Sequence, residues 1–180
     1  MKRITLLVFG LWAALHLVAC SPATPLARVM LEPTGEAGGD AVYQTVYDNG
    51  KTKETDAFSP EAERFTAVYG DFSCDIVNGK VINTLIATRL TNSAGEERDA
   101  DDTQKALLLA LADEIDHDIA ALSLFTAGTR HFAYVQLNVN WSSPGILYEY
   151  DSEAGCLSEL ARWDSYELTG LSLPEEPAAK

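Results

Sequence analysis

Only two histidines, His117 and His131, lie beyond the first twenty positions, whereas carboxylates are so plentiful that any pair of them is weak evidence for catalysis. His117 is the centre of an Asp-His-Asp run at 116–118, in a segment with a helical pattern. Consecutive residues of a helix point in different directions, so this run does not converge on one ion. His117 can pair with Asp113 or Glu114 at helical spacing, and a metal site there would need ligands from elsewhere. We expect a solvated helix face at His117 and a loop or edge position at His131.

The sequence lacks the motifs of common enzyme and cofactor sites. It has no G-x-S-x-G elbow, zincin histidine pair, C-x-x-C motif or phosphate-binding glycine loop. A calcium loop of the EF-hand type starting at Asp99 would need Gly at position 104 and Glu at position 110, where the chain has Gln104 and Ala110. An irregular calcium site at Asp99, Asp101 and Asp102 remains an alternative to helix capping. We expect no metal and no cofactor, and the sequence favours a non-enzymatic protein while leaving an enzyme as an alternative.

The N-terminus has the organisation of a secretory signal. A basic start precedes an apolar run of 16 residues at 4–19, which closes with Leu17-Val18-Ala19-Cys20. The run is short for a permanent membrane span, which needs about 20 residues. The closing motif resembles the lipobox of bacterial lipoproteins. That resemblance implies cleavage before Cys20, diacylglycerol on its sulfur and usually an acylated amine, which together form a stable membrane anchor.

The lipoprotein resemblance also bears on location and on the other cysteines. Ser21 follows Cys20 where an Asp would resemble an inner-membrane retention signal, so we expect an outer-membrane anchor with the protein facing the periplasm. Cys74 and Cys156 remain, and an oxidising compartment favours one Cys74–Cys156 disulfide. The alternative is two buried free thiols.

The chain is strongly acidic. Its 13 basic and 27 acidic residues give a formal net charge of −14, and removal of residues 1–19 leaves 11 basic residues and a charge of −16. Such a chain repels polyanions, so we expect no nucleic-acid partner. A cationic protein partner is favoured, while lipid on Cys20 would supply the attachment to the membrane.

The remaining pattern predicts one α+β domain at 41–173, between a flexible, Pro- and Gly-rich tether at 20–40 and a disordered tail at 174–180. Docking of the apolar run Arg28-Val29-Met30-Leu31 on the domain is the alternative for that part of the tether. Apolar residues at steps of three and four predict one main amphipathic helix at 103–121, capped by Asp101 with Gln104.

Other local signals place turns, a short helix and strands. Asn49-Gly50 and Asn78-Gly79 predict hairpins, and Ser59-Pro60 predicts a short helix ending near residue 68. Alternating segments between 122 and 173 predict an antiparallel β-meander.

One strand of this meander presents the best candidate binding surface. Its polar and aromatic face carries Phe132, Tyr134, Gln136, Asn138 and Asn140. Aromatic and amide groups suit contacts with protein or sugar. The alternatives are an ordinary hydrated sheet face or one covered by the helix.

The leading hypothesis is a lipid-anchored envelope protein that binds another envelope or secreted protein. A second hypothesis is a hydrolase acting on peptidoglycan or glycan, which requires His117 or His131 to meet a carboxylate or hydroxyl in a cleft. A third is a carrier of small ligands, which requires a cavity behind the meander.

Overall fold

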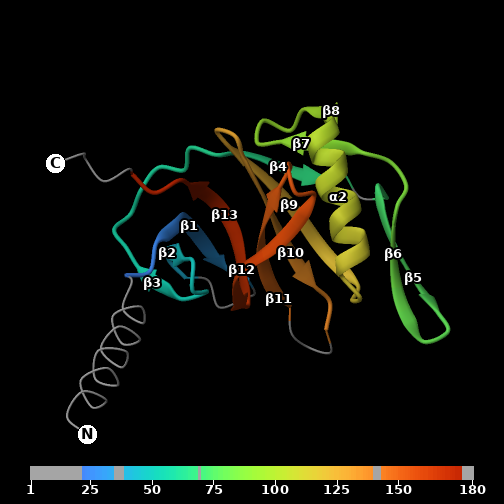
Figure 1. Cartoon of the computed structure of the whole chain (residues 1–180), viewed down its shortest axis with the longest axis horizontal. Helices are drawn as coiled ribbons and strands as arrows, with labels where there is room; N and C mark the ends of the chain where they lie inside the picture. Colours follow the sequence, from blue (N-terminus) through green and yellow to red (C-terminus); the bar gives the residue numbers. More distant parts are fainter. Residues whose placement is uncertain (1–21, 35–38, 69, 140–142, 176–180) are drawn as a thin grey trace, which may run out of the picture.

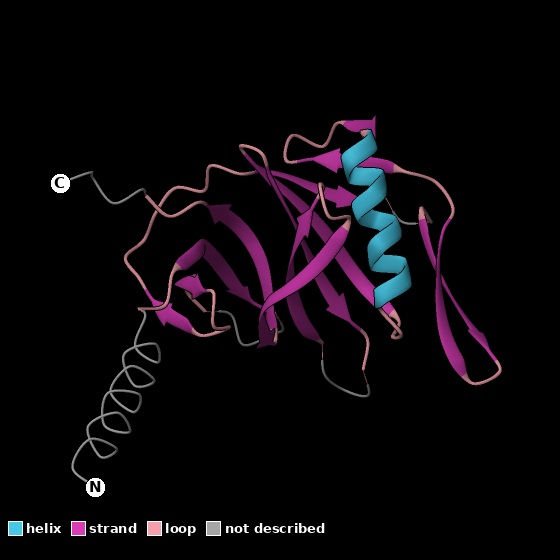
Figure 2. Ribbon diagram, in the orientation of Figure 1, coloured by secondary structure: helices cyan, strands magenta, loops and turns pink. Residues whose placement is uncertain are grey.

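The computed structural model describes residues 22–34, 39–68, 70–139 and 143–175, which form thirteen strands and a single helix (Figures 1 and 2). The elements are β1 (Pro25–Pro33), β2 (Val42–Tyr47), β3 (Thr52–Glu54), β4 (Glu63–Ala67), β5 (Phe72–Val77), β6 (Lys80–Leu85), β7 (Arg89–Asn92), β8 (Glu97–Asp99), α2 (Asp102–Glu114), β9 (Ile119–Ala127), β10 (Arg130–Leu137), β11 (Pro144–Asp151), β12 (Cys156–Asp164) and β13 (Tyr166–Ser172). The predicted α+β class is therefore wrong, because the fold is mostly β with one short helix.

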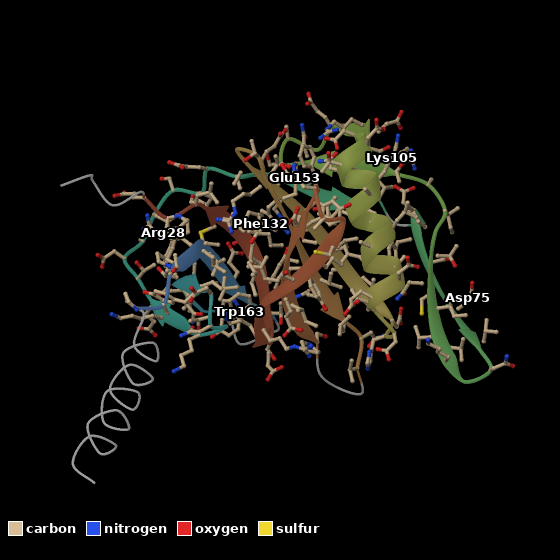
Figure 3. All side chains as sticks on the ribbon, viewed as in Figure 1. Arg28, Asp75, Lys105, Phe132, Glu153 and Trp163 are labelled. Atoms are coloured by element: carbon tan, nitrogen blue, oxygen red, sulfur yellow. The ribbon has the colours of Figure 1, made fainter. Side chains whose placement is uncertain are left out.

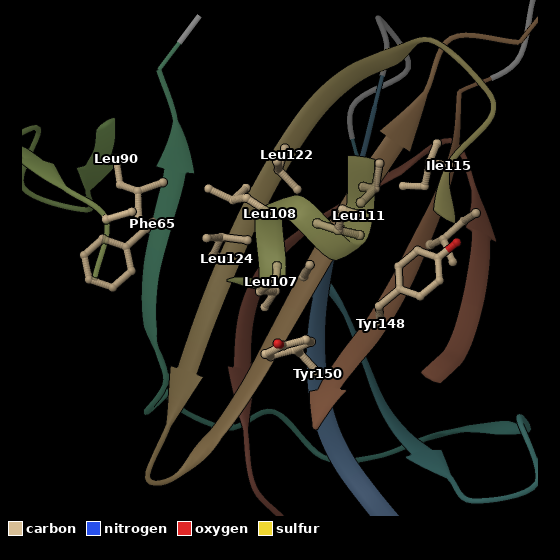
Figure 4. Packing of buried hydrophobic residues seen from close by; sticks show 14 of the residues in the cluster. Phe65, Leu90, Leu107, Leu108, Leu111, Ile115, Leu122, Leu124, Tyr148 and Tyr150 are labelled. Carbon is tan, nitrogen blue, oxygen red and sulfur yellow. The ribbon is translucent and has the colours of Figure 1, made fainter. Parts of the chain in front are cut away.

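Two antiparallel sheets and the helix form three layers. The smaller sheet has the order β13-β1-β2-β3 and the larger has the order β12-β11-β10-β9-β4-β7-β8. One buried cluster fills the space between the sheets and another lies between the larger sheet and α2. Figure 4 shows the second cluster, in which Leu107, Leu108 and Leu111 of α2 meet side chains of β9 and β11. The larger sheet is thus covered on both faces.

Helix α2 begins as predicted and ends earlier. The Asp101 carboxylate accepts a hydrogen bond from the Gln104 backbone N–H, and the Gln104 side chain accepts one from the Asp101 N–H, which confirms the capping box. The helix stops at Glu114, and Ile115 is already extended with ψ 117°. The predicted end at residue 121 is wrong because β9 starts at Ile119. Apolar residues at 115, 119 and 122 fit a helical spacing, yet Ile119 and Leu122 belong to β9.

The predicted tether at 20–40 is contradicted by β1. This strand lies between β13 and β2, and Ala27, Val29 and Leu31 have no exposed surface. Their spacing of two is the strand period, which places all three on the face that meets the larger sheet. Only residues 21–24 separate Cys20 from β1, so the folded domain begins at Pro25, 16 residues before the predicted start at residue 41.

The local turn signals are confirmed, and the short helix predicted after Pro60 is wrong. Asn78 and Gly79 have φ of 52° and 77° and connect β5 to β6, as expected of an Asn-Gly turn. Asn49-Gly50 likewise connects β2 to β3. Residues 63–67 instead form β4, which pairs with β9 and β7, because Phe65 is needed in the buried cluster under α2.

Candidate interaction site

The face of β10 predicted to bind a partner is covered by the smaller sheet. Phe132 is fully buried and Tyr134 is 2% exposed, both in the cluster between the two sheets. The Tyr134 hydroxyl donates to the Tyr166 carbonyl oxygen, and the Gln136 amide donates to the same oxygen at 3.0 Å. These three side chains therefore hold β10 to β13 and are not available to a partner.

The two remaining residues of that face lie beyond β10. Asn138 is exposed, and its amide donates to Asp118 Oδ2 at 3.3 Å. Asn140 lies outside the described residues, as does the lipobox residue Cys20. The predicted binding surface is thus reduced to Asn138 at the end of the sheet.

Cys74 and Cys156 are free thiols in this structure, so the predicted disulfide is not formed. Cys74 of β5 lies beside Asp118, close to the C-terminal end of β10. Cys156 of β12 pairs with Asp151, close to the N-terminal end of β10. The eight residues of β10 separate these ends by about 23 Å. A disulfide requires Cα atoms within about 7 Å. Burial, and then the charge and hydrogen bond of Asp118, raise the pKa of the Cys74 thiol.

The two histidines also occupy opposite ends of β10. His131 is the second residue of the strand, and its Nδ1 is buried with no hydrogen-bond partner among the described residues. His117 is exposed in the turn that follows α2, and its Nδ1 lies 2.6 Å from Asp116 Oδ1. The predicted pairing of His117 with Asp113 or Glu114 does not occur because the helix has already ended at Glu114.

His117 lines a pocket of about 320 Å³ at the end of α2, which we call the helix-end pocket. Its apolar wall includes Ile115, Leu137 and Ile146. Its polar wall consists of Glu114, Asp116, His117, Tyr148, Glu159 and Arg162. Arg162 binds Glu159 through two hydrogen bonds of 2.7 and 2.8 Å, which lowers the pKa of that carboxyl. Burial and the Glu159 charge raise the pKa of Tyr148.

The most exposed apolar surface belongs to the hairpin β5–β6, which forms a separate two-stranded sheet at one end of the molecule (Figure 1). On the hairpin, Ile76 is 76% exposed, and Val77 and Ile82 are exposed by 47% and 43%. Ile86, directly after β6, is 64% exposed, and Leu109 of α2 is 54% exposed. At the base of the hairpin, the Asp71 carbonyl accepts from the N–H groups of Ile86 and Ala87. Exposed apolar residues that gather on one element mark an interaction site more strongly than scattered ones.

The hairpin differs from two outer strands of the main sheets. β3 and β8 have three residues each, all exposed, and each carries both an acidic and a basic side chain. Short charged edge strands discourage pairing with other chains. The hairpin strands are longer, with six residues each, and their two charged residues, Asp75 and Lys80, stand among exposed apolar side chains, so they are less protected. The sequence indicates an apolar hairpin here, since Ile76, Val77 and Ile82 surround an Asn-Gly turn. It does not indicate that these side chains are exposed, because a hairpin of this composition is equally typical of a buried sheet.

Comparison with protein families, with characterised proteins and with solved structures gives no match to this chain. Among the described residues, no helix is long and apolar enough to span a bilayer, and no group of three or more His, Cys, Asp or Glu side chains is arranged to hold a metal ion.

Proposed function

We propose that this protein is anchored by lipid on Cys20 in the bacterial cell envelope, at the outer membrane facing the periplasm, and binds another envelope or secreted protein through the hairpin β5–β6. The exposed apolar hairpin carries the proposal. The exposed side chains of Ile76, Val77 and Ile82, and of Ile86 directly after β6, would be shielded from water in a complex, which is the usual driving force for association.

The position of the hairpin relative to the anchor supports a protein partner. β1 lies toward one end of the long axis and the hairpin at the other, and Figure 3 shows Arg28 of β1 far from Asp75 of β5. Only two peptide links join Cys20 to the first described residue, Pro22, a reach of at most about 7 Å. A lipid on Cys20 would therefore hold the β1 end near the membrane, with the hairpin directed into the periplasm.

The two other hypotheses have less support. A carrier needs a cavity behind the meander, and the described side chains of Phe125, Phe132, Tyr134 and Trp163 occupy that region. For a hydrolase, His117 does meet a carboxylate in the helix-end pocket, that of Asp116, but the two are exposed neighbours in sequence. The Glu159 carboxylate of the same pocket is already held by Arg162. The described lining of that pocket contains no Ser, Thr or Cys to serve as nucleophile.

Site-specific photo-crosslinking in cells that produce the protein tests the proposal. A photoreactive residue replaces Ile82 on the hairpin, and the matched control replaces Lys53 on β3, which is also exposed but lies on the smaller sheet. We expect one discrete protein adduct from position 82 and none from position 53. Equal labelling at both positions, or no adduct at 82, would contradict the proposed function.

The anchor is tested separately with Cys20→Ser. We expect the wild-type protein in the membrane fraction and the variant to lose the diacylglycerol mass on its N-terminal peptide. An unmodified Cys20 in the wild-type protein would remove the lipid anchor from the proposal and leave the hairpin untouched.

A further inference from the structure

The hairpin presents one strand edge whose backbone groups have no partner. Ile86 donates to the Asp71 carbonyl, and bonded pairs alternate along an antiparallel ladder. The pairs 73/84, 75/82 and 77/80 therefore exchange hydrogen bonds within the hairpin. The N–H and C=O groups of Phe72, Cys74 and Ile76 consequently point away from β6. No described backbone group pairs with this edge.

The opposite edge of the hairpin faces the molecule. β6 packs against α2, and the Asn83 side chain donates to the carbonyl oxygens of Ile115 and His117. In Figure 1 the two strands cross near the base of the hairpin, and toward the tip β5 lies on the side of β6 away from α2, so that β5 is the outer strand there. An extended chain would find β5 open to pairing and β6 obstructed.

The surroundings of β5 are apolar and acidic. Ile76 and Val77 are exposed near the tip, and Asp75 is exposed between Cys74 and Ile76. Four further carboxylates lie close to the hairpin: Asp118 beside Cys74, and Asp113, Glu114 and Asp116 around the groove between β6 and α2. The C-terminal end of α2 carries the negative end of the helix dipole, and no basic residue in its last turn offsets it. The electrostatic potential near the hairpin is therefore negative. Lys80 is the one basic side chain of β5 and β6.

The negative charge around β5 favours some binding partners for its open edge over others. A second copy of the chain would bring the same carboxylates into contact, which is unfavourable. An anionic lipid surface is repelled for the same reason, and the β1 end is the one next to the proposed anchor. A basic chain gains from both the carboxylates and the apolar side chains.

We propose that β5 binds an extended, basic segment of a partner protein by strand addition, with alternating basic and apolar side chains. This inference rests on the proposed function and names the partner's chemistry. In the added strand, one face places a basic side chain beside Asp75, and the opposite face places an apolar one beside Ile76, because successive residues of a strand alternate. Backbone hydrogen bonds to Phe72, Cys74 and Ile76 supply the pairing.

The probe is a fluorescein-labelled peptide of eight residues with alternating Lys and Val, titrated by anisotropy against the full protein in nonionic detergent. Detergent alone serves as the blank. We expect saturable binding with a dissociation constant on the order of 0.1–1 mM, weakened by raising the salt from about 0.05 to 0.5 M. A peptide with Glu in place of Lys, and one with alternate N-methyl groups that cannot pair as a strand, should both fail to bind.

Two proline variants assign the edge. Ile76→Pro removes an outward N–H from β5 and leaves the hairpin's own bonds intact, whereas Val81→Pro does the same on β6. We expect at least about tenfold weaker binding for Ile76→Pro and less than about twofold change for Val81→Pro. Asp75→Asn should weaken binding about two- to fivefold, as expected for loss of an opposite-charge cross-strand pair. If Ile76→Pro unfolds the hairpin, the N-methylated peptide still tests backbone pairing, because it is titrated against the unaltered protein.

Several results would overturn the inference. They are no saturation up to about 5 mM peptide, equal binding of the Glu peptide, equal binding of the N-methylated peptide, or equal loss from both proline variants. A blue shift of Ile82→Trp emission with phosphatidylglycerol vesicles, but not with the peptide, would assign the hairpin to a lipid surface and overturn it too. A cross-linked partner at position 82 combined with any of the first four results would leave the proposed function standing and reject strand addition alone.

Discussion

Asn83 joins the hairpin to the helix: its side-chain amide donates to the carbonyl oxygens of Ile115 and His117, in the segment that follows α2. Asn83 is 6% exposed, so these carbonyl groups are satisfied by a buried partner. Together with Phe72 and Leu85, which pack against the cluster under α2, this side chain holds the hairpin to the domain. The same contact satisfies the end of a helix whose last turn is acidic.

Asn83→Ala should loosen the hairpin before it unfolds the domain. The change leaves the Ile115 carbonyl without its partner, at a cost of about 1–3 kcal/mol. We expect faster amide hydrogen exchange in β5 and β6 than in β10, together with a lower free energy of unfolding. Thr84→Ala, at an exposed neighbouring position of β6, is the control and should change neither quantity appreciably. Unchanged exchange in the hairpin of Asn83→Ala would contradict this role.

The contact between Gly145 and Tyr134 should be intolerant of even one methyl group. A Cβ at position 145 would lie 1.7 Å from the Tyr134 hydroxyl oxygen and 2.2 Å from Cζ. Gly145→Ala therefore forces the ring off the Tyr166 carbonyl, and we expect a loss of about 3 kcal/mol in chemical denaturation.

Gly128→Ala is the matched comparison for that measurement. It meets open space at a φ of 61°, so only the backbone conformation is penalised, by about 1 kcal/mol. Adding Tyr134→Leu to Gly145→Ala should recover part of the loss. Equal costs at the two glycines would show that the ring does not occupy the space above Gly145.

Local signals in the sequence predicted local structure well. The capping box of Asp101 and Gln104 and the turn at Asn78-Gly79 each depend on side chains within a few residues, and the structure contains both. The meander of β9 to β12 also follows from alternation and short turns. These are features in which neighbouring residues alone determine the conformation.

Contacts between distant segments could not be predicted in this way. Phe132 and Tyr134 alternate with Ala133 and Val135, and nothing local indicates that β1, about 100 residues earlier, contributes to the sheet covering one face while α2 covers the other. Without that sheet, the face of Phe132 and Tyr134 looks available to a partner. The same missing contact made Ala27 to Leu31 look like part of a tether.

Tyr134 should make the protein less stable at high pH. Burial, and then the charge of Glu167, raise the pKa of its hydroxyl above the usual value of about 10. The folded state therefore holds this proton more tightly than the unfolded state. Its contribution is complete below about pH 10 and is lost as the pH rises from there toward the folded pKa.

Urea denaturation between about pH 8 and pH 11.5 measures this effect. We expect the wild-type free energy of unfolding to fall above pH 10 with an added slope of up to about 1.4 kcal/mol per pH unit that Tyr134→Phe lacks. The variant should also lose about 1 kcal/mol at pH 8, with the hydrogen bond to Tyr166. Parallel pH profiles for the two proteins would contradict the burial of this hydroxyl.

The two thiols of the domain should be free and unequal in reactivity. Cys156 is exposed. Burial and then the Asp118 charge raise the pKa of the Cys74 thiol, so a smaller fraction of Cys74 is deprotonated to the reactive thiolate at neutral pH. We expect iodoacetamide, added at pH 8 without reductant, to modify both residues and to modify Cys156 first, as followed by peptide mass spectrometry. Asp118→Asn should accelerate the modification of Cys74 and leave Cys156 unchanged. Labelling of both only after addition of a reductant would show that they are bonded, and would contradict their placement at opposite ends of β10.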